Sequence, residues 1–284
     1  MTPLVAIAVL AAAITHASWN AIAHAIKDQL LSFTLISGGG ALLGAVTACF
    51  VPLPAAEAWP YLVVSAVLHV AYMALLMRSF TLGDFGQMYP IARGTAPLVV
   101  TVLAAVFVGE RPDGWATAGV AVACAGLVGV ALWGIRGSQA RPHWPAITAA
   151  LATGLAIAGY YTTVDGVGVR ASGTSLGYIA WLMILEGLAV PAYTLCRRRG
   201  QLAAQLRPFA ARGLLGAALS VVAYGLVLWA QTKAPLAPIA ALRESSIIVG
   251  AAIGSVFFKE RFGAPRIAAA GLMVIGIGLM LHTS

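Results

Sequence analysis

The strongest constraint in this sequence is a succession of apolar segments of about 20 residues, separated by short polar stretches. A helix of that length crosses the ~30 Å hydrocarbon core of a bilayer, and lipid offers no partner for open backbone groups. Only 9% of the 284 residues are charged, against roughly 25% in soluble domains. We therefore expect an all-α integral membrane protein with ten transmembrane helices, at residues 3–25, 31–51, 59–80, 88–108, 114–134, 145–167, 174–196, 211–232, 236–258 and 263–282.

The chain also carries the signs of an internal duplication. A shift of 150 positions pairs Arg93 with Arg243, and six of the 19 residues from Arg93 to Arg111 are then identical to their partners. Because five is an odd number, equivalent helices of two five-helix units cross the membrane in opposite directions, as in many alternating-access transporters. The sequence predicts two inverted five-helix repeats, residues 1–136 and 144–284.

Basic residues lie mainly in alternate loops. The even-numbered loops hold Arg111, Arg170 and Lys233, whereas the odd-numbered loops hold Lys27, Arg78, Arg136, Arg141, Arg197, Arg198, Arg199, Arg207, Arg212, Lys259, Arg261 and Arg266. Cytoplasmic loops are usually the basic ones. We therefore expect a multi-pass protein of the bacterial inner (plasma) membrane with both termini outside. The net charge of +8 is then explained by orientation, and no nucleic-acid partner is expected.

Arg93 lies near the start of the fourth apolar segment, where a charge is expensive. An arginine at the bilayer centre costs about 2.5–3.5 kcal/mol on insertion scales, and its guanidinium group suits carboxylate or phosphate. We expect Arg93 and its repeat partner Arg243 to bind an anionic group of a small-molecule substrate. The alternative is a structural ion pair between Arg93 and a carboxylate on another helix, such as Glu186.

Glu186 and Glu244 are carboxylates well inside apolar segments, and Asp165 lies near the end of the sixth segment. A carboxylate removed from water takes up a proton more readily, so either glutamate is a candidate for proton coupling. The alternative is a fixed ion pair with Arg93 or Arg243. On a helix, the adjacent side chains of Arg243 and Glu244 point about 100° apart, so they do not both face one neighbour.

Polar and aromatic side chains interrupt the apolar segments. His16, Trp19 and Asn20 share one face of the first segment, which predicts either the wall of a substrate cavity or a hydrogen-bond network between helices. Further candidates for the substrate site are His69, Tyr72, Tyr89, Tyr161, Tyr224 and Trp229. The three cysteines have no metal-binding spacing, and we expect no metal, no cofactor and no disulfide framework.

Prolines mark the fourth and ninth segments. Pro97 lies inside the fourth, whereas Pro235 and Pro238 lie at the start of the ninth. Interrupted segments at corresponding places in two repeats often form a transporter's binding site, and proline removes a backbone donor. We expect both segments to open locally at matching depth. The alternative is that these prolines only begin helices.

Several motifs resemble the EamA family of the drug/metabolite transporter superfamily. They are HASWN at 16–20, YPIARG at 89–94, ER at 110–111, LRESS at 242–246 and ER at 260–261. The resemblance covers the whole chain and implies ten helices in two repeats of five. Known members export amino acids, metabolites or toxic compounds from bacterial cells, so it implies a carrier for a small solute without naming the solute. The basic loops of this chain differ from the usual family pattern, so orientation is not carried over from relatives.

We therefore expect a secondary transporter, an exporter of a small zwitterionic or anionic metabolite such as an amino acid, that works by alternating access. Protons are the candidate coupling ion, and a monomer or a homodimer is expected. No ATP-binding motif is present in the sequence. The alternatives are a lipid-head-group flippase, an accessory membrane subunit and, remotely, an intramembrane enzyme. No nucleophile elbow or HExxH motif occurs, so we expect no enzymatic activity.

Overall fold

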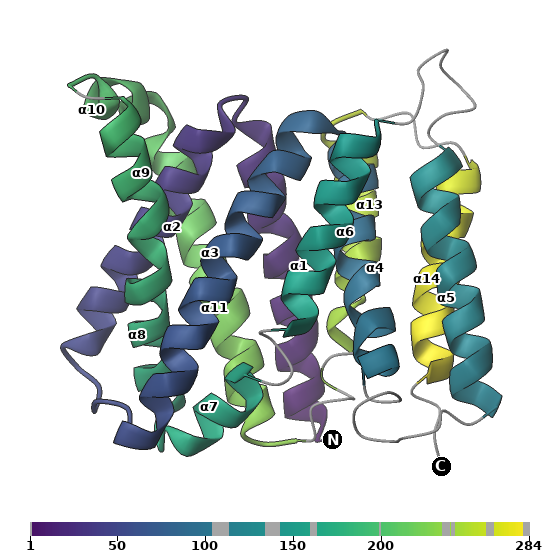
Figure 1. The fold of residues 1–284 in the computed structure, drawn as a ribbon, viewed down its shortest axis with the longest axis horizontal. Helices are drawn as coiled ribbons and strands as arrows, with labels where there is room; N and C mark the ends of the chain where they lie inside the picture. The colour runs from purple at the N-terminus through teal and green to yellow at the C-terminus, as the bar shows by residue number, and fades with distance from the viewer. Residues whose placement is uncertain are drawn as a thin grey trace.

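The computed structural model describes residues 2–103, 114–133, 143–159, 164–198, 200–234, 239, 242–259 and 264–280. Within these ranges the chain forms helices and no strands. Most of the helices run side by side as a bundle (Figure 1). The longest helices are α1 (Pro3–Ala25), α2 (Gln29–Ala48), α3 (Trp59–Leu82), α4 (Phe85–Leu103), α5 (Gly114–Trp133), α11 (Ala210–Gln231) and α14 (Ala264–Met280). The shorter ones are η1 (Ala56–Ala58), α6 (Trp144–Ala158), α7 (Asp165–Ala171), α8 (Ser175–Gly187), α9 (Ala189–Arg197), α10 (Leu202–Leu206), η4 (Arg207–Phe209) and α13 (Ser246–Val256).

Length and composition make this bundle a multi-pass membrane protein. Five described helical stretches are long and apolar enough to cross a bilayer, namely Pro3–Ala25, Gln29–Ala48, Ala56–Leu82, Ser175–Arg197 and Leu202–Gln231. Four shorter apolar helices accompany them, at Thr117–Gly129, Trp144–Ala158, Ser246–Val256 and Ile267–Gly276. Large apolar side chains such as Leu4, Ile7 and Leu214 are exposed on the outside of the bundle. The all-α expectation is confirmed for the described residues, whereas ten spans and two repeats stay predictions.

Local sequence explains where several helices begin. The Thr2 hydroxyl accepts a hydrogen bond from the Val5 backbone N–H at 3.4 Å, and Pro3 occupies the first helical position of α1. Proline is well placed there because its missing donor would have no partner in any case. The Asp28 carboxylate caps α2 in the same way, accepting from the Leu31 N–H at 3.2 Å. These caps satisfy backbone donors that the helix itself cannot pair.

One expectation about continuity was wrong, and another lies partly outside the described residues. Within the segment 145–167, α6 ends at Ala158 and α7 begins at Asp165, and residues 160–163 between them lie outside the described residues. The local opening expected at Pro97 is not seen, because α4 is helical without interruption from Phe85 to Leu103. The residues on both sides of Pro97 are helical, so the backbone hydrogen bond that proline removes does not interrupt α4. Pro235 and Pro238, and the acid–basic pairs at 110–111 and 260–261, lie outside the described residues.

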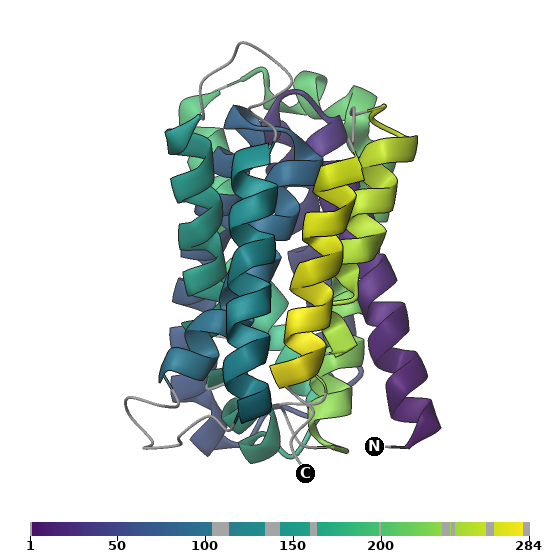
Figure 2. The same ribbon diagram turned by 90° about the vertical axis from the view of Figure 1, so that its right-hand side faces the viewer.

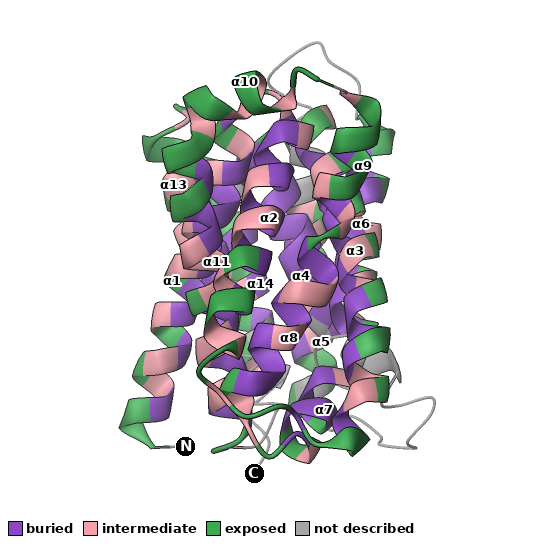
Figure 3. Ribbon diagram, turned by 90° about the vertical axis from the view of Figure 1, so that its left-hand side faces the viewer, coloured by how far each residue is buried: buried purple, intermediate pink, exposed green. Residues whose placement is uncertain are grey.

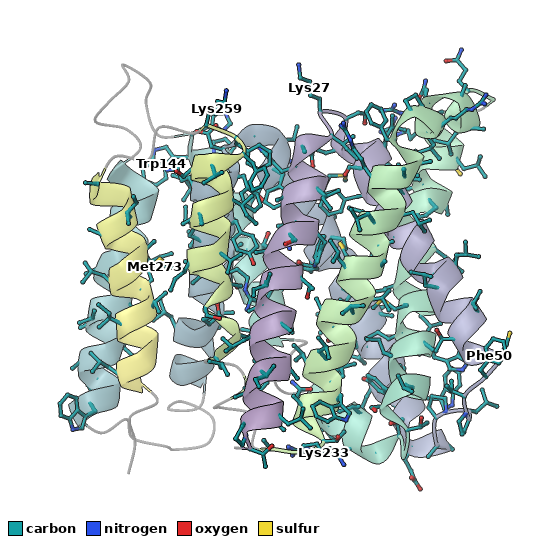
Figure 4. All side chains as sticks on the ribbon, turned by 180° about the vertical axis from the view of Figure 1, so that it is seen from behind. Lys27, Phe50, Trp144, Lys233, Lys259 and Met273 are labelled. Atoms are coloured by element: carbon teal, nitrogen blue, oxygen red, sulfur yellow. The ribbon has the colours of Figure 1, made fainter. Side chains whose placement is uncertain are left out.

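The two ends of the bundle carry different loops. Both termini and α7 lie at one end of the bundle (Figure 1). Lys27 and Lys259 lie at the opposite end from Lys233 (Figure 4). An ion pair of 2.6 Å between Arg198 and Asp28 joins the segments after α9 and α1. The basic odd-numbered loops that contain Lys27, Arg198 and Lys259 therefore gather at one end, as the charge pattern predicts.

Small residues let the helices approach closely. Helices α5 and α14 lie side by side along one edge of the bundle (Figure 2), where a Cβ atom at Gly126 would meet the Ala269 carbonyl at 2.6 Å. The Met273 side chain extends from α14 toward α4 (Figure 4) and packs against Gly94. Buried residues occupy the middle of the bundle (Figure 3), and polar side chains are among them.

Gly250 of α13 offers a direct test of this close packing. A Cβ atom at Gly250 would lie 2.5 Å from Cδ1 of the buried Tyr89 ring. Because that ring is itself stacked on Phe85, we expect Gly250→Ala to lower the free energy of unfolding by about 1–3 kcal/mol. Thermal unfolding in detergent measures the change.

The matched control is Gly225→Ala in α11. Its Cβ atom would meet Ile179 Cδ1 at 3.6 Å, an ordinary contact. This variant should lose no stability, and helix propensity favours alanine over glycine by up to about 1 kcal/mol. Equal effects of the two substitutions would contradict the packing described for α4 and α13.

Candidate functional site

Two arginines lie buried inside the bundle. Arg93 belongs to α4 and is 1% exposed, and Arg243 precedes α13 and is 2% exposed. The same electrostatic neighbourhood includes His16 from α1 and Tyr72 from α3, which both guanidinium groups influence. A charge inside an apolar bundle needs a partner to be stable. We call the cluster of Arg93, Arg243, Glu244, His16, Tyr72 and Tyr89 the arginine centre.

Arg93 is paired with Glu244. Arg93 Nη2 donates to Glu244 Oε1 at 2.5 Å, and both side chains are almost fully buried. The sequence analysis named Glu186 as an example of a structural partner for Arg93, and that example was wrong. Its alternative of an ion pair between Glu244 and Arg93 is confirmed. Glu186 faces His69 instead, with its Oε2 atom 3.5 Å from His69 Nδ1. The ion pair thus joins the first predicted repeat to the second.

The ion pair uses only part of the hydrogen-bonding capacity of the two groups. Arg93 Nε and Nη1 are buried and have no hydrogen-bond partner among the described residues, and the same holds for Glu244 Oε2. Buried polar atoms are nearly always paired in folded proteins, by protein, water or ligand. Two donors of a positively charged group and one acceptor of a negatively charged group therefore remain available to a further partner.

Helix α1 contributes the polar face expected from its sequence. His16, Trp19 and Asn20 are all buried. Trp19 Nε1 donates to His16 Nδ1 at 3.3 Å, and Asn20 Nδ2 donates to the His16 carbonyl at 2.9 Å. These two hydrogen bonds stay within α1. The other side of the His16 ring lies near Tyr89, with ring centroids 6.2 Å apart, so His16 connects α1 to the arginine centre.

A second buried polar group surrounds Asp165 and Glu186, and we call it the carboxylate centre. Asp165 accepts hydrogen bonds from Tyr178 Oη at 2.9 Å and from Tyr224 Oη. The Tyr224 ring also meets His69 edge to face, with centroids 5.2 Å apart. The sequence analysis singled out Tyr224, His69 and Glu186, but not Tyr178. Its only signal was an aromatic hydroxyl three residues into an apolar segment.

Aromatic rings fill the space beyond the arginine centre. The His24 ring lies 5.1 Å from Phe258, 5.5 Å from Phe80 and 5.7 Å from Phe85, measured between centroids. Phe85 also stacks on Tyr89 at 5.1 Å. These rings come from α1, α3, α4 and the segment after α13. We call them the aromatic cluster, and it lies where these four segments reach the Lys27 end of the bundle.

Trp229 lies elsewhere. It lines a cavity of about 440 Å³ between α2, α8 and α11, together with mainly apolar side chains that include Leu176, Ile179 and Val222. Leu176 and Val222 are exposed on the outer face of the bundle, so this cavity borders the lipid side. Tyr161, another sequence-predicted site residue, lies outside the described residues.

A family model matches the second half of the chain. Residues 144–282 match the model of the EamA-like transporter family. These residues belong to that family. The resemblance read from the motifs is thereby confirmed for this part of the chain, and EamA proteins are membrane transporters. No curated protein matches the chain.

A solved structure has the same fold. One crystal structure, titled only as that of a protein, superposes with a TM-score of 0.65 over 100% of both chains, at 17% sequence identity. At that identity the similarity establishes the fold alone. The match over residues 144–282 indicates a membrane protein of transporter type, and the solved structure adds only the shared fold.

A double-mutant cycle measures how strongly the Arg93–Glu244 pair holds α4 to the segment before α13. Arg93→Met or Glu244→Leu alone leaves a buried charge without its partner, and each should cost about 3–5 kcal/mol of stability. The double variant removes both charges and should cost less than the sum, with a coupling energy of about 0.5–3 kcal/mol. Thermal unfolding in detergent gives the four values. Strictly additive losses would show that the two side chains do not stabilise one another.

Proposed function

We propose that this protein is a secondary transporter of the bacterial inner membrane that exports a small zwitterionic or anionic metabolite, such as an amino acid. Two inverted repeats of five helices, residues 1–136 and 144–284, would rock around a site at mid-membrane. The basic loops place the Lys27 end in the cytoplasm, and hence both termini outside. The monomer contains the whole proposed site, whether or not it pairs as a homodimer.

The arginine centre carries this proposal. Arg93 offers Nε and Nη1 as charged donors, and Glu244 offers Oε2 as a charged acceptor, all buried and unpaired among the described residues. A guanidinium group binds a carboxylate with two donors, and a carboxylate binds an ammonium group. A solute with both groups on neighbouring atoms satisfies both residues at once. An α-amino acid has that arrangement, which is why we favour a zwitterion over a simple anion.

The remaining candidates surround this pair. His16, Tyr72 and Tyr89 belong to the arginine centre, and Arg243 adds a second positive charge. Trp19 and Asn20 hold His16 from within α1. His69 and Tyr224 contact one another beside Glu186. We propose that the first group binds the solute and that the second serves proton coupling.

The aromatic cluster supports alternating access. Phe85 is part of this cluster and stacks on Tyr89, which lies one turn from Arg93 on α4. Movement of α4 that opens the route between the Lys27 end and Arg93 must therefore separate the rings of His24, Phe85 and Phe258. The cluster is our candidate for the cytoplasmic gate, with Tyr89 as its connection to the solute.

A lipid-head-group flippase is less well supported. The cavity at Trp229 borders lipid, as a flippase requires, but its lining is mainly apolar and contains none of the residues of the arginine centre. A head group carries charge and needs polar partners. An accessory subunit has no need for two buried arginines.

A thermal-shift comparison tests the zwitterion proposal. The probes are matched sets of one amino acid, the acid that lacks its amino group and the amine that lacks its carboxylate. A ligand at 100 times its dissociation constant stabilises a protein by about 2.7 kcal/mol. We expect the intact amino acid to raise the unfolding temperature of the wild type more than either fragment, and Arg93→Ala to abolish the shift.

Glu244→Gln is the second variant, because it keeps the shape of the side chain and removes its charge. It should reduce the advantage of the amino acid over the deaminated acid. Stabilisation by amines alone, or equal shifts in wild type and Arg93→Ala, would make Arg93 a structural residue. If Arg93→Ala does not fold, Arg93→Lys keeps a positive charge and tests the two-donor geometry.

Proton coupling is tested with the same solute in vesicles that carry a pH gradient. If Glu186 or Glu244 carries the proton, the corresponding Gln variant should lose pH-driven accumulation but keep exchange of labelled for unlabelled solute. Exchange needs no net proton movement, so it reports that the variant still binds and carries the solute. Unchanged pH dependence in both variants would exclude proton coupling at these residues.

A further inference from the structure

The carboxylate centre contains an acid that the solute site does not use. Asp165 is fully buried, with 0% exposure. Three helices meet at its carboxylate, since Tyr178 of α8 donates to Oδ1, Tyr224 of α11 donates to Oδ2 and Ser65 of α3 lies against it. Among the described residues no basic side chain donates a hydrogen bond to Asp165. A buried carboxylate without such a partner is expensive, and ionisable residues inside a membrane protein are usually functional.

Asp165 is linked to Glu186 by two side chains. Ser65 Oγ lies 3.1 Å from His69 Nδ1, and the same ring nitrogen lies 3.5 Å from Glu186 Oε2. The two carboxylates also interact electrostatically. A hydroxyl donates and accepts at once, and imidazole takes up and releases protons readily. Ser65 and His69 therefore have the chemistry to pass a proton between the acids.

The positions of Ser65 and His69 along α3 indicate from which end of the bundle the connection between Asp165 and Glu186 runs. Ser65 is six residues, about 9 Å, from the first residue of α3, and His69 is ten residues, about 15 Å. Helix α7, with Asp165, lies at the end of the bundle where both termini are found (Figure 1). The chain of side chains thus leads from that end toward the middle of the bundle, where the arginine centre lies.

We propose that Asp165 and Glu186 form one linked proton-binding site, filled from the end of the bundle where α7 lies, with Ser65 and His69 as the route between the two acids. This inference rests on the proposed proton coupling of transport. It adds Asp165 as the entry residue and gives Glu186, rather than Glu244, the coupling role. Glu244 then takes no part in proton coupling and keeps its ion pair with Arg93.

Proton transfer from Asp165 to Glu186 conserves the total number of protons on the four side chains. His69 Nδ1 lies 3.0 Å from the Ser65 carbonyl, which can only accept, so this nitrogen carries a proton at the start. In one concerted step the Nδ1 proton passes to Glu186 Oε2, the Ser65 hydroxyl proton passes to His69 Nδ1, and protonated Asp165 gives its proton to Ser65 Oγ. At the end Asp165 is ionised, Glu186 is protonated, and Ser65 and His69 hold the number of protons with which they began.

The surroundings of the pair are compatible with this exchange. Asp165 faces Tyr178 and Tyr224 and feels the charge of Arg243. Glu186 faces His69 and lies within electrostatic range of Tyr72. Arg170, the basic residue of α7, is directed away, since its guanidinium group donates to the Gln231 and Ala234 carbonyls. Protonation of either acid therefore changes the charge that the other one meets.

Infrared pH titration of the full chain in lipid vesicles tests the linkage without any solute. Protonated carboxyl groups absorb apart from ionised ones, so each buried acid can be followed. Asp165→Asn should remove one titrating band and move the midpoint of the Glu186 band by about one pH unit or more, and Glu186→Gln should do the reverse. Glu57→Gln, at an exposed position in η1, is the control and should change neither band. A remaining band with an unchanged midpoint, or no titrating band from Asp165, would overturn the proposal.

The Ser65 variants test the route and remain available if Asp165→Asn does not fold. After a pH jump, Ser65→Ala should keep both bands but slow protonation of Glu186 by about 10²-fold or more, the usual contribution of a positioned proton-transfer group. Ser65→Thr keeps the hydroxyl and should restore the rate. Equal rates in wild type and Ser65→Ala would overturn the route. Because no solute is used, failure here is separate from failure of binding at Arg93 and Glu244.

Discussion

The rest of the structure depends on burying a positive and a negative charge together in a bundle that lipid surrounds. Arg93 of α4 and Glu244 of the segment before α13 neutralise one another by direct contact. Neither charge is stable there alone, since a buried charge without a partner is far more costly than a paired one. The same contact leaves donors on one side and an acceptor on the other. A solute that inserts its own charges can therefore compete for both residues, and the cost of parting them is offset by new charge-assisted hydrogen bonds.

Three layers of side chains follow from this arrangement. The aromatic cluster around His24 and Phe85 lies toward the Lys27 end, the arginine centre lies at mid-bundle, and the carboxylate centre extends toward the end with α7. Tyr89 connects the first layer to the second through its stack on Phe85. Tyr72, within electrostatic range of both Arg93 and Glu186, lies between the second and the third. In the proposed mechanism, solute binding and proton transfer use separate groups of residues that interact electrostatically through Tyr72.

The sequence predicted some of this well and other parts poorly, for physical reasons. The limits of α1 were predicted to the residue because Pro3 marks its start and a mainly apolar sequence continues to the polar turn at Lys27. The charge of Arg93 within an apolar segment pointed to a buried group, but the partner named as an example was wrong because spacing along one helix does not reveal the rotation of its neighbours. Trp229 lines the cavity near lipid, and its place in the substrate site stays a prediction.

The central claim is that the Arg93–Glu244 pair binds the solute. The most direct measurement is an experimental structure of the full chain with the amino acid that stabilises it most. The account predicts the carboxylate of that solute against the guanidinium group of Arg93, and its ammonium group against Glu244. A solute bound in the cavity between α2, α8 and α11, with the ion pair unchanged and untouched, would contradict it.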